Sequence, residues 1–245
     1  NCPPWAVSAE KIQHNTDKKI INYKNAFLKV YDVPVMYFPK FFHPDPTVKR
    51  QSGFLIPTVK NSSNSDNFLN TPYFFAIAEN KDATFSPRFY PKEKILLQTE
   101  LRQTNFNSNH IADLSYYTEK GKNSKNHFFY EYDNEFIGDS FETNRIDLKI
   151  QQTSNDTYLK TDKLKSDIIN DYNILENSLG LNMYSDDLTL SFNANVYEDL
   201  DKNKSDRYEF ILPRINLVKN INNKTSLNGN FSFESQALVR NYNTN

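Results

Sequence analysis

Residues 188–196 read LTLSFNANV, an uninterrupted alternation of apolar and polar side chains. Because successive side chains of a β-strand point to opposite faces, this period gathers the apolar residues on one face and the polar residues on the other. The same alternation recurs at 145–150, at 95–101 and at 128–132. The repeated period of two predicts an antiparallel β-sheet rather than a helical protein.

Polar stretches rich in Asn, Ser, Asp and Lys separate these runs at 61–67, 120–126 and 199–206. This composition is typical of solvated turns and loops. Helical spacing competes only around residues 162–175, where acidic and apolar residues mix, and we assign that segment to a strand. A further strand is predicted at 227–233, shortly before the sequence ends.

The composition excludes several classes of protein. Among 245 residues, 29 Lys and Arg against 30 Asp and Glu give a net charge of −1 and no reason to expect a nucleic-acid partner. Hydrophobic residues make up 38%, and no run approaches the ~18 apolar residues of a membrane-spanning helix. The 14% aromatic content is too high for a disordered chain.

Residues that could carry chemistry are sparse. The single cysteine excludes an internal disulfide and a cysteine-based zinc site, and the four histidines lack metal-ligand spacing. No serine has a nucleophile-elbow motif or stands out beside a base. We therefore expect no catalytic residue, no metal and no cofactor.

The alternating pattern is compatible with two folds. A soluble β-sandwich would turn the apolar face into its core, whereas a membrane β-barrel would turn it toward lipid and keep a polar lumen. Membrane strands run for ~9–11 residues and sandwich strands for ~5–6, and the run at 188–197 reaches the longer length. The periodicity alone supports both folds equally.

The first fifty residues differ from the rest in predicted strand length and in proline content. Residues 5–9 and 23–30 predict short strands, with a turn at 14–18. Proline lacks a backbone N–H and marks sheet edges and junctions, so a cluster of prolines predicts a domain boundary at 40–52. The clustered prolines are Pro34, Pro39, Pro44 and Pro46. The chain begins at Asn1 without a signal-peptide pattern, and we expect it to be a piece of a longer protein.

One ordered set of short elements between Cys2 and Pro87 is more specific than any single motif. In order, these elements are Cys2, Trp5, Ala9, Asn25-Ala26, Lys29-Val30, Val33-Pro34-Val35, Tyr37-Phe38-Pro39, KRQSGFLIP at 49–57, Pro72-Tyr73, IAEN at 77–80, Asp82-Ala83-Thr84 and Pro87. The set resembles the LPS-assembly protein family of Gram-negative outer membranes, known as LptD or organic solvent tolerance protein. Beyond Pro87 the resemblance thins to the strand pattern.

The resemblance implies an all-β fold with two domains. Residues 1–50 would be the C-terminal strands of a periplasmic β-jellyroll. Residues 51–245 would be the N-terminal antiparallel strands of a large outer-membrane β-barrel, which remains incomplete within this sequence. A soluble secreted sandwich and a general porin-like barrel are the alternatives.

The resemblance also implies a transport function without catalysis. Lipopolysaccharide would pass from a periplasmic bridge, through a jellyroll groove and a seam in the barrel wall, into the outer leaflet. The implied partners are lipopolysaccharide, an outer-membrane lipoprotein plug of the LptE type and a periplasmic bridge protein of the LptA type. Neither a cofactor nor nucleic acid is expected.

Individual residues receive roles from the same resemblance. Pro57 and Pro72 lie where the first two barrel strands of the family carry gate prolines, although prolines also simply terminate strands. Cys2 occupies the family position that forms a disulfide with a cysteine near the far end of the barrel, and that cysteine is absent from this sequence.

Two further sets of residues are assigned more coarsely. Alternate residues of the first two strands would line a lipid groove, although plain core packing explains them equally well. The groove residues are Trp5, Val7, Ala9, Ala26, Leu28 and Val30. The residues assigned to the junction between jellyroll and barrel are Pro34, Pro39, Arg50 and Gly53.

Overall fold

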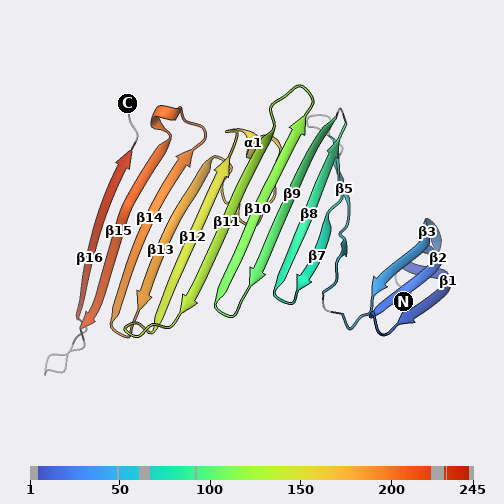
Figure 1. Cartoon of the computed structure of the whole chain (residues 1–245), viewed down its shortest axis with the longest axis horizontal. Coiled ribbons are helices and arrows are strands. Elements are labelled where there is room, and N and C mark those ends of the chain that lie inside the picture. Colours follow the sequence, from blue (N-terminus) through green and yellow to red (C-terminus); the bar gives the residue numbers. More distant parts are fainter. Residues whose placement is uncertain are drawn as a thin grey trace. The chain divides into compact units, whose positions relative to one another are not determined.

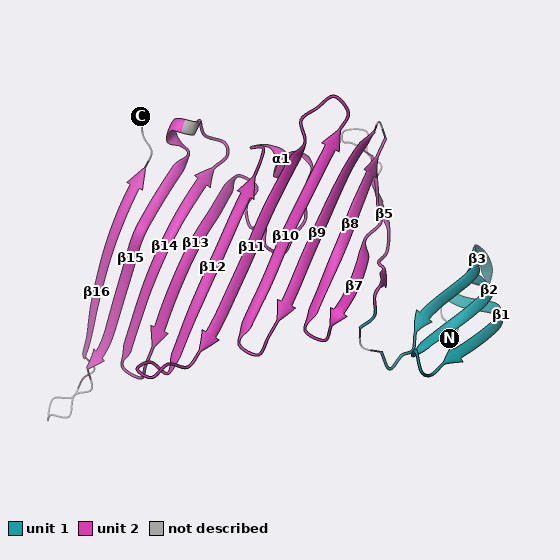
Figure 2. Ribbon diagram, in the orientation of Figure 1, with its two compact units in different colours: residues 1–51 teal, residues 52–245 magenta. Residues whose placement is uncertain are grey.

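The computed structural model describes residues 5–48, 50–60, 67–91, 93–221, 229 and 231–242. The chain divides into two compact units, residues 1–51 and residues 52–245 (Figure 2). Both units are built from antiparallel β-strands. In the part of the chain that the structure describes, no helix is long and apolar enough to cross a membrane.

Unit 1 contains a three-stranded sheet in the order β1 (Trp5–Asn15), β2 (Ile20–Val30) and β3 (Val33–Pro44). The β2–β3 connection is a two-residue hairpin turn at Tyr31 and Asp32, whose φ angles are 47° and 64°. Positive φ at both turn residues matches the right-handed twist of the flanking strands. The predicted strands are therefore present but longer, and His14 belongs to β1 rather than to the turn.

The clustered prolines lie mainly on an edge of this sheet. Pro34, Pro39 and Pro44 all belong to β3, which among the described strands pairs only with β2. An edge strand tolerates proline because one side of its ladder needs no donor. Pro34 and Pro39 therefore lie inside unit 1, whereas Arg50 and Gly53 flank the division between the units.

Unit 2 contains a thirteen-stranded antiparallel sheet, in which consecutive strands from β7 to β16 pair with each other (Figure 1). At one edge, β4 pairs with β7, and β6 pairs with β5 and β8. The strands of its main body, β8 to β16, are 10 to 14 residues long. The sheet stays open in the described residues, with β16 at one edge and β4–β5 at the other. The strands are β4 (Gly53–Phe54), β5 (Thr58–Lys60), β6 (Phe68–Asn70), β7 (Tyr73–Ala78), β8 (Lys81–Tyr90), β9 (Lys94–Thr104), β10 (Ser108–Glu119), β11 (Lys125–Phe136), β12 (Thr143–Thr153), β13 (Ile174–Tyr184), β14 (Leu188–Asp199), β15 (Tyr208–Ile221) and β16 (Phe231–Tyr242).

The four alternating runs are confirmed as strands, and lie in β14, β12, β9 and β11. The strand predicted at 162–175 is wrong up to residue 173, since the segment follows the short helix α1 (Tyr158–Thr161) and β13 begins only at Ile174. Its apolar residues Leu164 and Ile168 are buried instead of alternating in a ladder. The strand predicted at 227–233 falls partly outside the described residues, and Phe231 opens β16.

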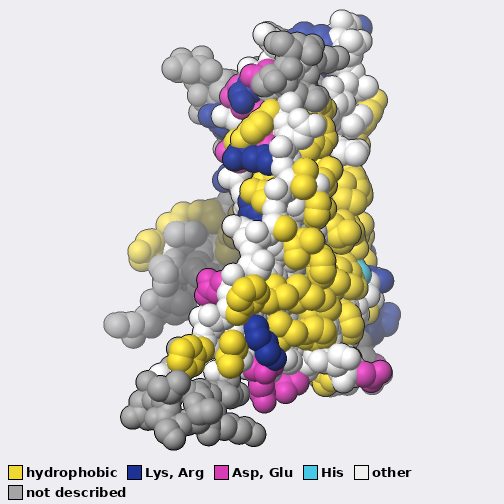
Figure 3. All heavy atoms as spheres, turned by 90° about the vertical axis from the view of Figure 1, so that its left-hand side faces the viewer, with side chains coloured by type: hydrophobic (Ala, Val, Ile, Leu, Met, Phe, Trp, Pro, Cys, Tyr) yellow, Lys and Arg dark blue, Asp and Glu magenta, His cyan; other side chains and the backbone are white. Residues whose placement is uncertain are grey.

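One face of the large sheet is apolar and exposed. Leu190 lies directly opposite Met183 and Leu217, and directly opposite residues share a face. Leu179 on this face is 54% exposed. Figure 3 shows the hydrophobic side chains gathered in a continuous surface along one side of the sheet. A sandwich would bury this face beneath a second sheet, and within the described residues of unit 2 no second sheet covers it.

The exposed apolar face predicts an asymmetric response to charge. In the full-length protein in lipid vesicles, Phe192→Lys should lower the free energy of unfolding by about 2–4 kcal/mol, because the ammonium group enters an apolar environment. Ser191→Lys, on the opposite face, should be nearly neutral. Urea unfolding of both variants measures the difference, and equal losses would contradict the assignment of the two faces.

Candidate functional site

The first two strands of the large sheet are each broken in two. Residues 55–57 separate β4 from β5, and Thr71-Pro72 separates β6 from β7. The two broken strands share five paired positions, two between β4 and β7 and three between β5 and β6. The regular strands β10 and β11 share ten. Within the described residues, the edge of the sheet is therefore held by fewer paired positions than its body.

Pro72 removes one bond from a paired position. The Leu55 N–H donates to the Pro72 carbonyl at 2.9 Å. In a regular antiparallel ladder, residues that face each other in this way exchange a second bond in the opposite direction. Residue 72 has no N–H to donate, so this position keeps half of its hydrogen bonding.

Pro57 lies in a segment with one residue too many. Phe54 is opposite Tyr73 and Thr58 is opposite Asn70, so four steps along the first strand match three along the second. An extra residue of this kind bends the strand and leaves a position unpaired. Proline is tolerated at such irregularities.

Pro87 in β8 interrupts the next pairing in the same way. The Thr71 N–H donates to the Pro87 carbonyl at 3.1 Å, and Pro87 cannot return a bond. The first three strands of the sheet thus each carry a proline, and the three interruptions lie side by side because Thr71 and Pro72 are consecutive. From the sequence alone Pro87 is only a family landmark, because its position opposite Thr71, next to Pro72, depends on the register.

The connection between β12 and β13, residues 154–173, lies against the polar face of the sheet, and we call it the docked loop. Three sheet side chains bond to its backbone carbonyls, and these buried acceptors would otherwise lack partners. Arg88 Nη1 donates to Asp162 O at 3.0 Å, Gln98 Nε2 to Lys165 O at 2.9 Å, and Gln151 Nε2 to Ile168 O at 3.0 Å.

Apolar side chains complete the docking. The loop contributes Tyr158, Leu159, Leu164 and Ile168 to a buried cluster, and the sheet contributes Leu96, Tyr117 and Phe129. This core is the largest in the described residues and holds the loop on the polar face. The sequence does not predict this core, because apolar residues spread over a loop have no regular period.

A buried polar network joins the docked loop to the β10–β11 hairpin. Ser115 is opposite His127 in the register, and its Oγ lies 2.5 Å from His127 Nδ1 and 2.6 Å from the Tyr158 hydroxyl. Asp113 Oδ1 lies 3.5 Å from His127 Nε2. The expectation that no serine stands beside a base is wrong, since the hairpin register brings the two together. The side chains of Asp113 and His127 are 0% exposed, so the network is closed to a substrate.

The network predicts release of the docked loop at alkaline pH. Burial raises the pKa of the Tyr158 hydroxyl, because the phenolate would lose its solvation. The raised pKa stabilises docking fully below the unfolded-state value of about 10, and this stabilisation is lost as the pH rises above it. Protease cleavage within residues 154–173 of the full-length protein should therefore increase as the pH rises from 10 to 11.

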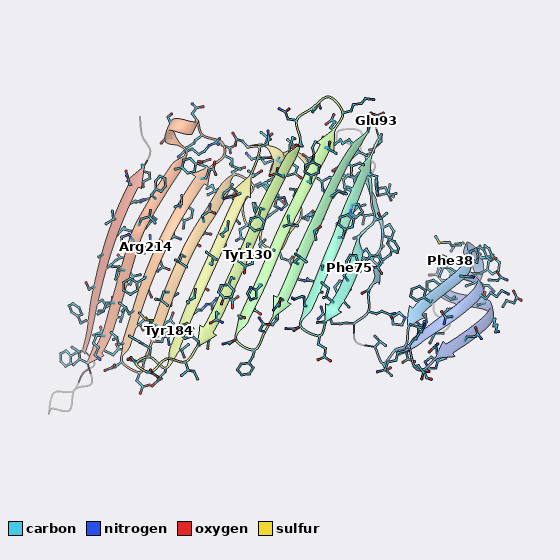
Figure 4. All side chains as sticks on the ribbon, in the orientation of Figure 1. Phe38, Phe75, Glu93, Tyr130, Tyr184 and Arg214 are labelled. Atoms are coloured by element: carbon cyan, nitrogen blue, oxygen red, sulfur yellow. The ribbon has the colours of Figure 1, made fainter. Side chains whose placement is uncertain are left out.

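Tyr158→Phe should remove this alkaline increase, at a cost of about 0.5–1.5 kcal/mol for the lost hydrogen bond. Tyr184→Phe is the matched control, since Tyr184 lies at the end of β13 and is 41% exposed (Figure 4). An unchanged alkaline increase in Tyr158→Phe would contradict the assignment.

The residues assigned to a lipid groove share one face of unit 1 in the backbone register. They form three directly opposite pairs, Trp5–Val30, Val7–Leu28 and Ala9–Ala26. β3 extends this face with Met36 opposite Leu28 and with Phe38 opposite Ala26 (Figure 4). Contact with lipid stays a prediction. Cys2 lies outside the described residues.

In the described ranges, no group of three or more His, Cys, Asp and Glu side chains is arranged to hold a metal ion. The architecture instead defines a class: an all-β protein whose large open sheet turns an apolar face outward and a polar face toward a docked loop. This is the arrangement of a membrane β-barrel wall.

Comparison with known proteins identifies the family. A family model described as LptD protein matches residues 21–134. The LPS-assembly protein LptD of Pseudoalteromonas atlantica is 30% identical over 200 residues, which cover 80% of this chain and 26% of that protein. The LPS-assembly protein LptD of Pseudomonas aeruginosa strain UCBPP-PA14 is 34% identical over 116 residues, which cover 47% of this chain and 12% of that protein. The LPS-assembly protein LptD of Shewanella oneidensis is 35% identical over 105 residues, which cover 41% of this chain and 14% of that protein.

The chain belongs to the LptD family, and the resemblance seen in the sequence is confirmed. It spans about a quarter of the length of the Pseudoalteromonas atlantica relative.

Proposed function

We propose that this chain takes part in the assembly of lipopolysaccharide in the outer membrane, by binding and gating rather than by catalysis. The large sheet would form part of a barrel wall, and residues 1–50 would be the end of a periplasmic jellyroll. The row of interruptions at Pro57, Pro72 and Pro87, at one edge of a sheet with an exposed apolar face, carries this proposal. The names of the relatives, LPS-assembly proteins, support it.

The interrupted edge would serve as a lateral gate. A barrel wall satisfies its backbone groups by pairing every strand, so a bulky lipid can leave sideways only where that pairing is weak. The first two strands share five paired positions where regular neighbours share ten. Each missing bond lowers the cost of opening by about 0.5–1.5 kcal/mol.

The remaining surfaces fit the partners proposed for such a machine. The apolar face of unit 1, with Val7, Leu28 and Phe38, would receive acyl chains from a bridge protein of the LptA type. The polar face of the large sheet would meet a lipoprotein plug of the LptE type. The docked loop occupies part of that face, so the plug would contact the sheet beside it.

Restoring the missing donors tests the gate. In the full-length protein, Pro57→Val with Pro72→Val should strengthen the edge and reduce surface display of lipopolysaccharide severalfold, measured by surface labelling of intact cells. Pro46→Val is the matched control, the same change at an exposed proline in a turn outside both sheets, and should leave display largely intact. Unchanged display in the double variant would remove the gate and favour a porin-like barrel. An equal loss in the control would show that the effect is not specific to the edge.

The disulfide proposed for Cys2 has a separate test. In full-length protein extracted from outer membranes without reductant, Cys2 should resist alkylation by a maleimide and become reactive after reduction, because the bond protects the thiol. A Cys2→Ser variant supplies the background signal. A fully reactive Cys2 before reduction would exclude the bridge.

A further inference from the structure

A pocket of about 310 Å³ lies between the interrupted strands and the docked loop. Its walls come from β5, β6, β8, the start of β9 and the loop, so segments far apart in the sequence converge there. Five basic side chains and a single carboxylate line it. The basic residues are Lys60, Arg88, Lys94, Lys163 and Lys165, and the acid is Asp162.

Arg88 is the central observation. It is only 7% exposed, and its Nε is buried without a hydrogen-bond partner. Its Nη1 donates to loop carbonyls, which are neutral, and in the described part of the chain no carboxylate forms an ion pair with its guanidinium. A buried charge with an unused donor is costly unless a ligand pairs with it.

The single acid of the pocket does not neutralise the remaining cations. The Asp162 carboxylate lies 4.0 Å from Lys94 Nζ and 3.5 Å from Lys125 Nζ, so two ammonium groups already surround it. Within the described residues, Lys60, Lys163 and Lys165 form no ion pair with a carboxylate. The pocket therefore carries a positive charge that calls for an anion with several acceptor oxygens.

The wall beside these cations is aromatic. Phe68 and Tyr90 lie with their ring centroids 5.4 Å apart, and the Arg88 guanidinium lies 5.2 Å from the Phe68 centroid. Aromatic faces offer an apolar surface to the C–H face of a sugar ring, while guanidinium and ammonium groups bind phosphate oxygens. The volume admits a phosphorylated sugar but not a complete lipid.

We propose that this pocket binds a phosphoryl group carried on a sugar, with Arg88 as its buried anchor and Lys60, Lys163 and Lys165 around it. The identity of the sugar carrier rests on the proposed function, since a phosphorylated glycolipid that approaches the gate would meet this pocket beside β5 and β6. Phosphate binding itself does not depend on that function.

The test compares three lysine changes in the full-length protein in detergent. Lys60→Gln, Lys163→Gln and Lys165→Gln combined remove charge without touching the Arg88 bonds to the docked loop. The control combines Lys120→Gln, Lys160→Gln and Lys202→Gln, which remove the same charge from connections at the same end of the sheet. Resistance of the docked loop to protease reports that each variant is folded.

Two binding measurements follow. Inorganic phosphate binding is measured by ³¹P line broadening, and glycolipid binding is measured with a diphosphorylated glycolipid and its dephosphorylated form. Wild type and control should bind phosphate, and the pocket variant should bind it about tenfold more weakly or worse. The preference for the phosphorylated glycolipid should fall by the same factor.

The outcomes separate the two proposals. Equal phosphate binding by wild type, control and pocket variant, or no binding by any of them, would overturn the pocket. Equal weakening in the control would also overturn it, since the effect would then be one of general charge. Phosphate binding that depends on the pocket, without any glycolipid binding, would support the site for a free anion and count against the proposed lipid transport.

Discussion

The large sheet depends on one constraint: its backbone groups have to be satisfied by neighbouring strands, because an apolar outer face offers no competing solvent. Strands β8 to β16 meet this constraint with matched lengths of 10 to 14 residues. A proline breaks the constraint locally, since it deletes a donor that no other group replaces. Pro57, Pro72 and Pro87 stand together at one edge, so the weakness is greatest there. A fourth proline, Pro213 in β15, lies at a register shift between β15 and β16.

The polar face solves a different problem. Side chains such as Gln98 and Gln151 carry amide groups that satisfy the carbonyls of the docked loop, so a loop without regular structure can be buried. Arg88 takes part in the same docking but keeps its Nε unused. The docked loop, the interrupted strands and the basic pocket are therefore connected. Lys60 and Phe68 belong to the broken strands, and Lys163 and Lys165 belong to the loop.

The sequence predicts local structure better than it predicts contacts between distant segments. The run at 188–196 predicts β14 because alternation is a property of a strand itself. The prolines at 57 and 72 could be located from the resemblance, yet the missing bond opposite Leu55 depends on register. Ser115 and His127 meet only across a hairpin, and the pocket gathers cations from three distant segments. Side chains without a shared period leave no signal in a single sequence, so the pattern at 162–175 predicts a strand where the structure has the second half of the docked loop.

The order of the strands also has a consequence for how the chain assembles. Each strand of the main body pairs with its neighbours in the sequence, so the sheet can grow hairpin by hairpin with little loop-closure entropy to overcome. The bond from Arg88 to Asp162 joins residues 74 positions apart and requires the intervening strands to be in register first. Closure of the 154–173 segment is thus a late, non-local step. A slip of one residue in the strand pairing between β8 and β12 would turn side chains such as Gln98, Ser115 and Gln151 to the apolar face. Residues 154–173 would then lose the side chains that hold them on the polar face.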